Sequence, residues 1–169
     1  AINHMAKQYV NQSIDTMPLS TFYTEGICLD FSHKKLKELI DTQDIIKACE
    51  KYNFTIKKGD TVLLYTNHYR KNFNTENWNN GPGVTAKATE WLGNKEIAAF
   101  GVETMSPGVP GVSNREVHEI CGKLGFTHYE NMINLHLLIG RGRFRFIGLP
   151  LKIRGGTGSP VRAVAIFEN

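Results

Sequence analysis

The sequence lacks the patterns that mark membrane-spanning, disulfide-rich and cysteine-zinc proteins. No apolar run in the 169 residues approaches the roughly 20 that a membrane-spanning helix needs, so we expect no membrane partner. The cysteines are odd in number, widely spaced and without a CxxC pair: Cys28, Cys49 and Cys121. This spacing disfavours a disulfide framework or a zinc finger. We predict three buried thiols in a reducing compartment, the cytoplasm.

Several enzyme motifs are also missing. No GxSxG sequence indicates a serine-hydrolase elbow, and no cysteine has a convincing histidine partner in the sequence. The glycine-rich stretch GGTGSP at 155–160 is followed by neither GK[ST] nor a predicted helix. It therefore predicts a turn between two strands rather than a phosphate-binding loop. The net charge of +4 is spread along the chain, which favours a solvated surface over nucleic-acid binding.

The length and the 41% apolar content indicate one domain spanning residues 1–169. Short apolar runs predict strands at 27–31, 61–65, 97–103, 126–130, 143–149 and 161–167. Apolar spacing predicts helices at 42–52, at 86–92 after a Thr85 cap, and from Ser113 to a stop at Gly125. Ser113 and Glu116 form the pattern of a capping box. Strands and helices alternate only in part, so the predicted class is mixed α/β.

One segment is longer than an ordinary connection between two elements. Residues 67–83, NHYRKNFNTENWNNGPG, are polar and rich in asparagine, but they also contain three aromatic side chains. Long structured loops are usually functional. Among the histidines in turns and loops, His68 inside this segment is the one of interest.

A histidine and a glutamate stand where each side chain needs a partner. His118 lies at the margin of the apolar stripe of the predicted helix, and Glu130 ends the strand that follows. A buried unpaired carboxylate costs several kcal/mol, and His and Glu meeting across a helix-to-strand turn suit a metal site. Spacing alone also allows a solvated histidine and an ordinary strand-end glutamate. His128 shares a strand face with Glu130 and either orients it or is an ordinary satisfied histidine.

The end of the chain resembles a known family. LPLKIRGGTGSPVRAVAIFEN at 149–169 looks like the closing signature of the cyclase-like metal-dependent hydrolases, which include bacterial kynurenine formamidase and isatin hydrolase. The resemblance continues upstream, in the family's order, through GVTAKATEWL, IAAFGVETMSPG, NREVHEICGKLGFTHYEN and INLHLL. It implies the family's swivelling β/β/α domain, a mixed sheet flanked by helices. Homodimers or homotetramers are common among such relatives.

The first residues, AINHM, become interpretable through this resemblance. The family's metal motif is HxGTHxDxPxH, and NQSIDTMPL after AINHM matches the segment that follows the motif. His4 then corresponds to the last histidine of the motif, with Ile2 where the motif usually has proline. The resemblance implies that the chain begins within the motif, lacking the N-terminal strand, two metal-binding histidines and the metal-binding aspartate. It also makes His4 the proton shuttle of the reaction.

The resemblance assigns roles to His118 and Glu130 as well. A histidine and a glutamate at this separation contribute to a second metal position in kynurenine formamidases, and to the outer shell in single-metal relatives. The implied cofactor is one or two Zn²⁺ or Mn²⁺ ions, which polarise a carbonyl and lower the pKa of bound water towards ~7.

The expected reaction is arylformamidase-like hydrolysis of a C–N bond in an amide or cyclic amide. The alternatives are an isatin, cyclic imide or lactone hydrolase of the same family, or a truncated binding or structural relative without catalysis. The family's substrates commonly carry an aniline- or indole-derived ring. Tyr69, Phe73 and Trp78 are therefore candidates to stack on an aromatic amide or cyclic imide, with His68 or an asparagine bonding its polar edge. It is equally open that these aromatic side chains hold the loop against its own domain.

Overall fold

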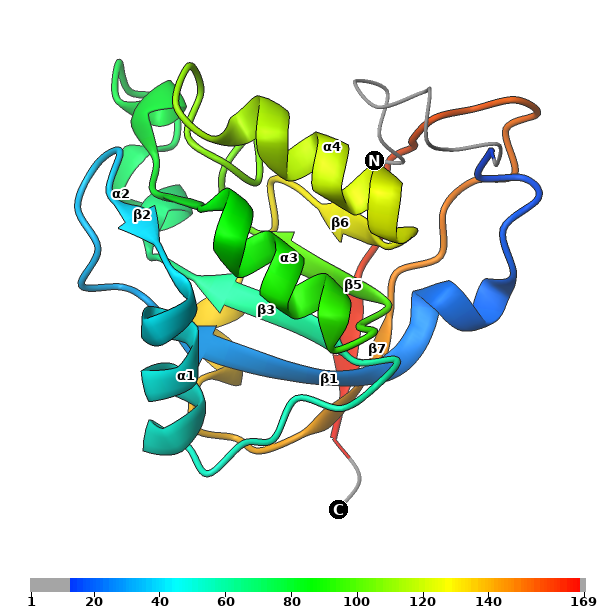
Figure 1. Cartoon of the computed structure of the whole chain (residues 1–169), viewed down its shortest axis with the longest axis horizontal. Coiled ribbons are helices and arrows are strands. Elements are labelled where there is room, and N and C mark those ends of the chain that lie inside the picture. Colours follow the sequence, from blue (N-terminus) through cyan, green and yellow to red (C-terminus); the bar gives the residue numbers. More distant parts are fainter. Residues whose placement is uncertain (1–12, 168–169) are drawn as a thin grey trace.

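The computed structural model describes residues 13–167 as a mixed α/β fold. Six strands form one sheet in the order β6-β5-β3-β1-β7-β8, and α1, α3 and α4 lie against one face of it (Figure 1). The sheet strands are β1 (Tyr23–Asp30), β3 (Thr61–Tyr65), β5 (Ala99–Val102), β6 (Thr127–Tyr129), β7 (Phe144–Ile147) and β8 (Val164–Ile166). The helices are α1 (Thr42–Lys51), α2 (His68–Asn72), α3 (Ala86–Asn94) and α4 (Asn114–Leu124). The mixed sheet flanked by helices confirms the predicted fold class.

Four neighbouring strands, β1, β3, β5 and β6, run parallel, and each step between them carries a helix: α1, α3 and then α4. β7 runs antiparallel to β1, and β8 antiparallel to β7. Two further short strands, β2 (Leu39–Ile40) and β4 (Gly83–Val84), pair separately. No helix within residues 13–167 has the length and apolar character needed to span a bilayer. The carboxyl ends of the four parallel strands share one edge, where α/β proteins usually bind ligands.

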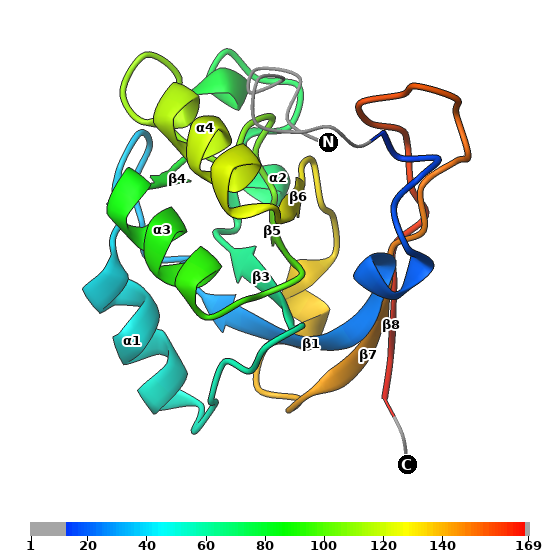
Figure 2. The ribbon, with the colours of Figure 1, turned by 45° about the vertical axis from the view of Figure 1, so that its right-hand side comes forward.

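The core lies on both faces of the sheet. On the helix side, the apolar stripes of the three helices bury side chains such as Ile45, Leu92 and Val117 against β1, β3 and β5. On the other side, a second cluster includes Phe22, Phe144 and Leu135 of the 3₁₀ helix η4 (Leu135–Leu138). In Figure 2, η4 lies on the side of the sheet away from α1, α3 and α4. All three cysteines are buried, as predicted.

Several boundaries differ from the sequence prediction for physical reasons. β1 begins at Tyr23 rather than at residue 27, because its first half pairs with the distant β7. The segment 67–83 contains α2, the 3₁₀ helix η3 (Trp78–Asn80) and β4, so it is not a plain loop. The capping box at Ser113 is wrong: its Oγ accepts from Val109 N at 3.0 Å and donates to Val84 O at 2.8 Å. The helix stop at Gly125 is confirmed, with φ +76°.

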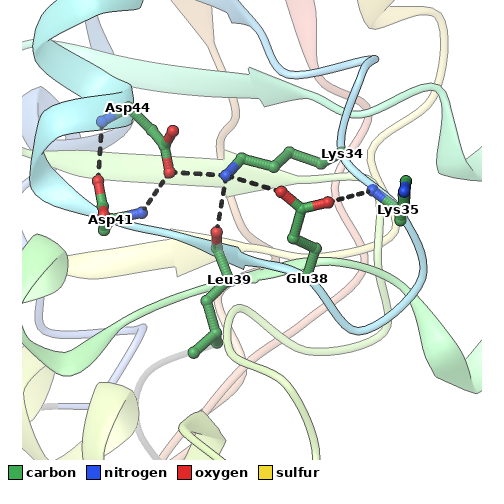
Figure 3. A network of polar contacts seen from close by, with 6 residues as sticks. All are labelled: Lys34, Lys35, Glu38, Leu39, Asp41 and Asp44. Carbon is green, nitrogen blue, oxygen red and sulfur yellow. Dashed lines mark hydrogen bonds and ion pairs between the residues drawn. The ribbon is translucent and has the colours of Figure 1, made fainter.

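A buried lysine fixes the connection between β1 and α1 (Figure 3). The Lys34 side chain is only 8% exposed, and its Nζ donates to Leu39 O at 2.9 Å and to Asp44 Oδ2 at 2.8 Å. Nζ also lies 3.1 Å from Glu38 Oε1. Asp44 completes a capping box with Asp41 at the start of α1. Burial alone would raise the pKa of Asp44, but the bonds from Lys34 and from the Asp41 backbone hold it below its ordinary value.

A second buried ion pair joins β7 to the turn before β3. Asp60 is 1% exposed, and one of its oxygens accepts from Arg143 Nη2 while the other accepts from Lys57 N at 2.7 Å. Arg143 also donates to Thr55 O at 3.1 Å. Arg143, which directly precedes β7, is therefore not a freely solvated surface residue. Instead, Arg143 neutralises a carboxylate far away in the sequence.

We predict that Lys34→Met destabilises the fold by about 2 kcal/mol at pH 7, because it leaves two carboxylates and a carbonyl without their shared donor. The lowered pKa of Asp44 means that this pairing contributes fully above the ordinary value of 3.8 and is lost as the pH falls below it. Urea unfolding of both proteins should show the difference shrinking in that acidic range. The exposed neighbour Lys35→Met is the control; a constant difference at all pH values contradicts the assignment.

We predict that Arg143→Met costs about 3 kcal/mol in the free energy of unfolding, because it strands a buried carboxylate at Asp60. Lys58→Met is the matched control, since its pair with Glu96 is exposed, with side chains 75% and 63% accessible. Equal midpoints of urea denaturation for the two variants would show that the buried pair contributes no more to the free energy of unfolding than the exposed pair does.

Candidate metal centre

Helix α4 presents His118 to the interior. Val117 and Cys121 are fully buried on its apolar stripe, and His118 between them is 1% exposed. The His118 Nδ1 atom lies 2.8 Å from Asn114 O, one turn back in the helix. A carbonyl oxygen only accepts hydrogen bonds, so in the neutral ring Nδ1 carries the proton and Nε2 carries the lone pair. This is the arrangement that metal-binding histidines usually have.

Glu130 meets this histidine from the end of β6. Its Oε1 lies 3.8 Å from His118 Nε2, and its side chain is 21% exposed. The structure therefore brings together the two residues that the sequence analysis paired, against the alternative of a solvated helix histidine. Their role as metal ligands stays a prediction.

His128 contacts Glu130 directly, whereas the sequence predicted only that the two residues share a strand face. It lies on β6 with 1% exposure, and its Nε2 is 3.1 Å from Glu130 Oε1. The imidazole rings of His118 and His128 stand edge to face, with centroids 4.8 Å apart. One ligand atom from each of the three residues lies within 4.8 Å of the others. The only sequence signal was the two-residue spacing from Glu130, which does not reveal the helix opposite.

The protonation states in this cluster suit a cation. Burial lowers the pKa of His128 to about 4, so its ring is neutral at pH 7. Burial alone would raise the pKa of Glu130, but the hydrogen bond from His128 and the electrostatic effect of both neighbouring histidines together outweigh it and keep the pKa below its ordinary value. Neutral imidazole and ionised carboxylate are the forms that bind a divalent metal.

Glu130 also borders a large cavity of about 870 Å³ on the face of the sheet away from the helices. Apolar side chains such as Leu63, Met132 and Phe146 line it, together with the segment 159–165. Most small-molecule sites are concave and predominantly apolar with a few polar groups. The cluster therefore has one member, Glu130, that reaches both the buried histidines and an open space.

The four predicted substrate-binding residues lie at the end of β3, two strands away from β6 in the sheet. His68 stacks on Trp78, and Tyr69 stacks on Phe73, with centroid separations of 5.3 and 4.7 Å. Both His68 nitrogens are engaged, Nε2 with Trp78 O at 2.9 Å and Nδ1 with the Asn72 amide at 3.1 Å. These contacts lie within the segment itself and pack its rings against one another. The substrate-binding role stays a prediction.

His4 and Glu103 are the remaining two residues to be placed relative to the candidate centre. His4, the predicted proton shuttle, lies outside the described residues. Glu103, which the sequence analysis did not single out, is 1% exposed just after β5. Its Oε2 accepts from Thr66 N, Thr66 Oγ1 and His68 N at 2.7, 2.8 and 3.2 Å. An acidic residue ending the apolar run IAAFGVE was the available signal; it holds the start of α2 in place.

We predict that the fold loses stability between pH 6.5 and about 4 because of His128. In the folded protein the pKa of His128 is lowered from 6.5 to about 4, so the unfolded chain takes up the proton first as the pH falls. The free energy of unfolding is therefore unaffected by this group above pH 6.5 and decreases below it. The loss is on the order of 3 kcal/mol. Urea unfolding with a chelator present measures it. His128→Gln should flatten this slope, and the exposed His33→Gln should not; an unchanged slope in His128→Gln contradicts the prediction.

Comparison with known proteins connects this geometry to a family. The sequence profile of the family described as putative cyclase matches residues 1–109. An isatin hydrolase of Roseibium aggregatum is 26% identical over 173 aligned residues, which cover 95% of this chain. The chain spans 65% of the length of that relative.

Solved structures show the same fold. Isatin hydrolase A from Ralstonia solanacearum aligns with a TM-score of 0.83 at 25% identity, over 96% of this chain and 66% of the other. An isatin hydrolase bound to the product analogue thioisatinate aligns with a TM-score of 0.86 at 24% identity, over 98% and 68%. The arrangement of helices and sheet is therefore one that these hydrolases share.

Proposed function

This chain belongs to the putative cyclase family, and we propose that it acts in a metal-dependent hydrolase that opens the C–N bond of an isatin-like cyclic amide. The observation that carries the proposal is the His118–Glu130 pair, with a separation of 3.8 Å and a histidine tautomer set by Asn114. Similarity to isatin hydrolases supports the substrate class. It favours a cyclic amide over the arylformamide that the sequence analysis placed first.

The residues of this chain fit a divalent cation by their chemistry. Imidazole nitrogen and carboxylate oxygen are donors that suit Zn²⁺ and Mn²⁺. When bound, such an ion polarises a carbonyl and lowers the pKa of water. His118 Nε2 and Glu130 Oε1 would hold it. The Asn114 carbonyl fixes the His118 ring by accepting its Nδ1 proton, so that the lone pair faces Glu130.

The remaining parts of the proposal rest on the resemblance. His4 takes a proton from water and delivers it to the leaving nitrogen, for which a neutral imidazole near pH 7 is suited. The apolar cavity beside Glu130 offers space for an aromatic ring. Amide cleavage then joins the water oxygen to the carbonyl carbon and breaks the C–N bond. One proton of the water goes to the ring nitrogen and the other is released, giving a carboxylate and an aromatic amine.

Variants of the protein, expressed with any residues that its gene encodes before Ala1, test the proposal. We predict that His118→Ala and Glu130→Ala lower the metal content at least tenfold and lower isatin hydrolysis with it. His4→Ala should keep its metal and lose about 10²–10⁴-fold in turnover, as expected for a general base. The exposed His33→Ala is the control. Metal content comes from elemental analysis, and turnover from the absorbance of the opened product.

The substrate panel separates the alternatives. Hydrolysis of isatin above that of N-formylkynurenine and a simple lactone supports the cyclic amide. A preference for N-formylkynurenine would instead support arylformamidase activity. Full metal content and full activity in all three variants would refute the site, and a metal-loaded protein without any hydrolysis would leave only a binding or structural role.

A further inference from the structure

We infer that His128 is a third metal ligand, so that His118, His128 and Glu130 form a cation site contained within α4, β6 and the residue after β6. The inference deepens the metal site of the proposed function and rests on it. The resemblance assigns only His118 and Glu130, and it gives His128 no role. The site would need no ligand from outside residues 114–130.

The spacing of the donor atoms carries the inference. Two ligands on one tetrahedral zinc, each at about 2.1 Å, lie about 3.4 Å apart. Glu130 Oε1 is 3.1 Å from His128 Nε2 and 3.8 Å from His118 Nε2, which bracket that value. One donor atom from each of the three residues lies within 4.8 Å of the others. Both Nε2 atoms approach the same carboxylate oxygen.

The surroundings favour coordination by both rings. The rings meet edge to face at 85°, which lets two Nε2 atoms converge on Glu130 from different directions. His118 is fixed on α4 by Asn114, and His128 on β6 by the sheet and by the ring of Phe100, 5.7 Å away. Ligands held on a helix and a strand are preorganised. The exposed side of Glu130 faces the cavity, which gives a cation a way in and leaves a position for another ligand.

Coordination by His128 requires its ring proton to move. In the neutral ring, the hydrogen bond to Glu130 places the one N–H at Nε2, because a carboxylate oxygen only accepts. A cation between Nε2 and Oε1 replaces this proton, which transfers through solvent to Nδ1 of the same ring. The imidazole stays neutral, and the carboxylate stays ionised. The other possible role, orienting Glu130 through that hydrogen bond, keeps the proton at Nε2 and leaves this nitrogen off the metal.

Nuclear magnetic resonance on the 169-residue chain separates these roles. With ¹¹³Cd²⁺ as the probe and ¹⁵N-labelled histidine, a metal-bound nitrogen shows a direct ¹⁵N–¹¹³Cd coupling. We expect coupling at Nε2 of both His118 and His128, assigned with His118→Gln and His128→Gln. Coupling at His118 without coupling at His128 would overturn the inference.

Zinc affinity gives a second readout by competition with a chromophoric chelator. His128→Gln should weaken binding at least tenfold, whereas His136→Gln removes a histidine outside the cluster and should leave it unchanged. Unchanged affinity in a folded His128→Gln protein also overturns the inference. If both couplings appear but the protein hydrolyses nothing, the proposed function fails and the three-ligand site stands.

Discussion

Helix α4 has to bury its apolar stripe against the sheet, and this constraint determines where every group of the candidate centre lies. Val117 and Cys121 are fully buried, so the residue between them on the same side, His118, is carried into the interior. Gly125 ends the helix in a left-handed conformation that turns the chain back through Phe126 into β6. The return places His128 opposite His118 and Glu130 at the rim. The centre is therefore a product of one helix–turn–strand unit.

The parallel arrangement then relates this unit to the rest of the molecule. β6 is an edge strand, and the carboxyl ends of β5 and β3 follow next to it. Acidic side chains stand just past two of these ends, Glu103 after β5 and Glu130 after β6, with different partners. Glu103 is closed off by three hydrogen bonds to the chain around Thr66. Glu130 contacts His118 and His128 on one side and borders a cavity on the other. Of the two carboxylates, it is therefore the one placed to bind a cation.

The parts predicted well from the sequence are those decided by local patterns. The run TVLLY forms β3 with the expected limits, and helical spacing located α1, α3 and α4 within two residues at their starts. The pairing of His118 with Glu130 was also within reach, because a helix stop and a strand separate them by a short, regular path. Apolar periodicity depends only on neighbours in the sequence, so it carries this information.

What the sequence did not reveal depends on distant contacts. Asp60 and Arg143 meet across the sheet, and no local pattern connects them. Ser113 has the sequence pattern of a helix cap, yet its hydroxyl donates a hydrogen bond to the carbonyl of Val84 in β4. The rings of 67–83 stack on one another, a choice that composition leaves open. The role of His128 was not recognised in the sequence, because its two-residue spacing predicts a shared strand face with Glu130 but does not predict that α4 packs against that face.

The central claim is that a divalent cation binds between α4 and the end of β6. Anomalous diffraction at the zinc edge, from crystals of this protein grown with zinc, tests it most directly. The account predicts an anomalous peak about 2.1 Å from His118 Nε2 and from the Glu130 carboxylate. Ordered side chains at His118 and Glu130 with zinc bound only elsewhere, or with no peak at all, would contradict it.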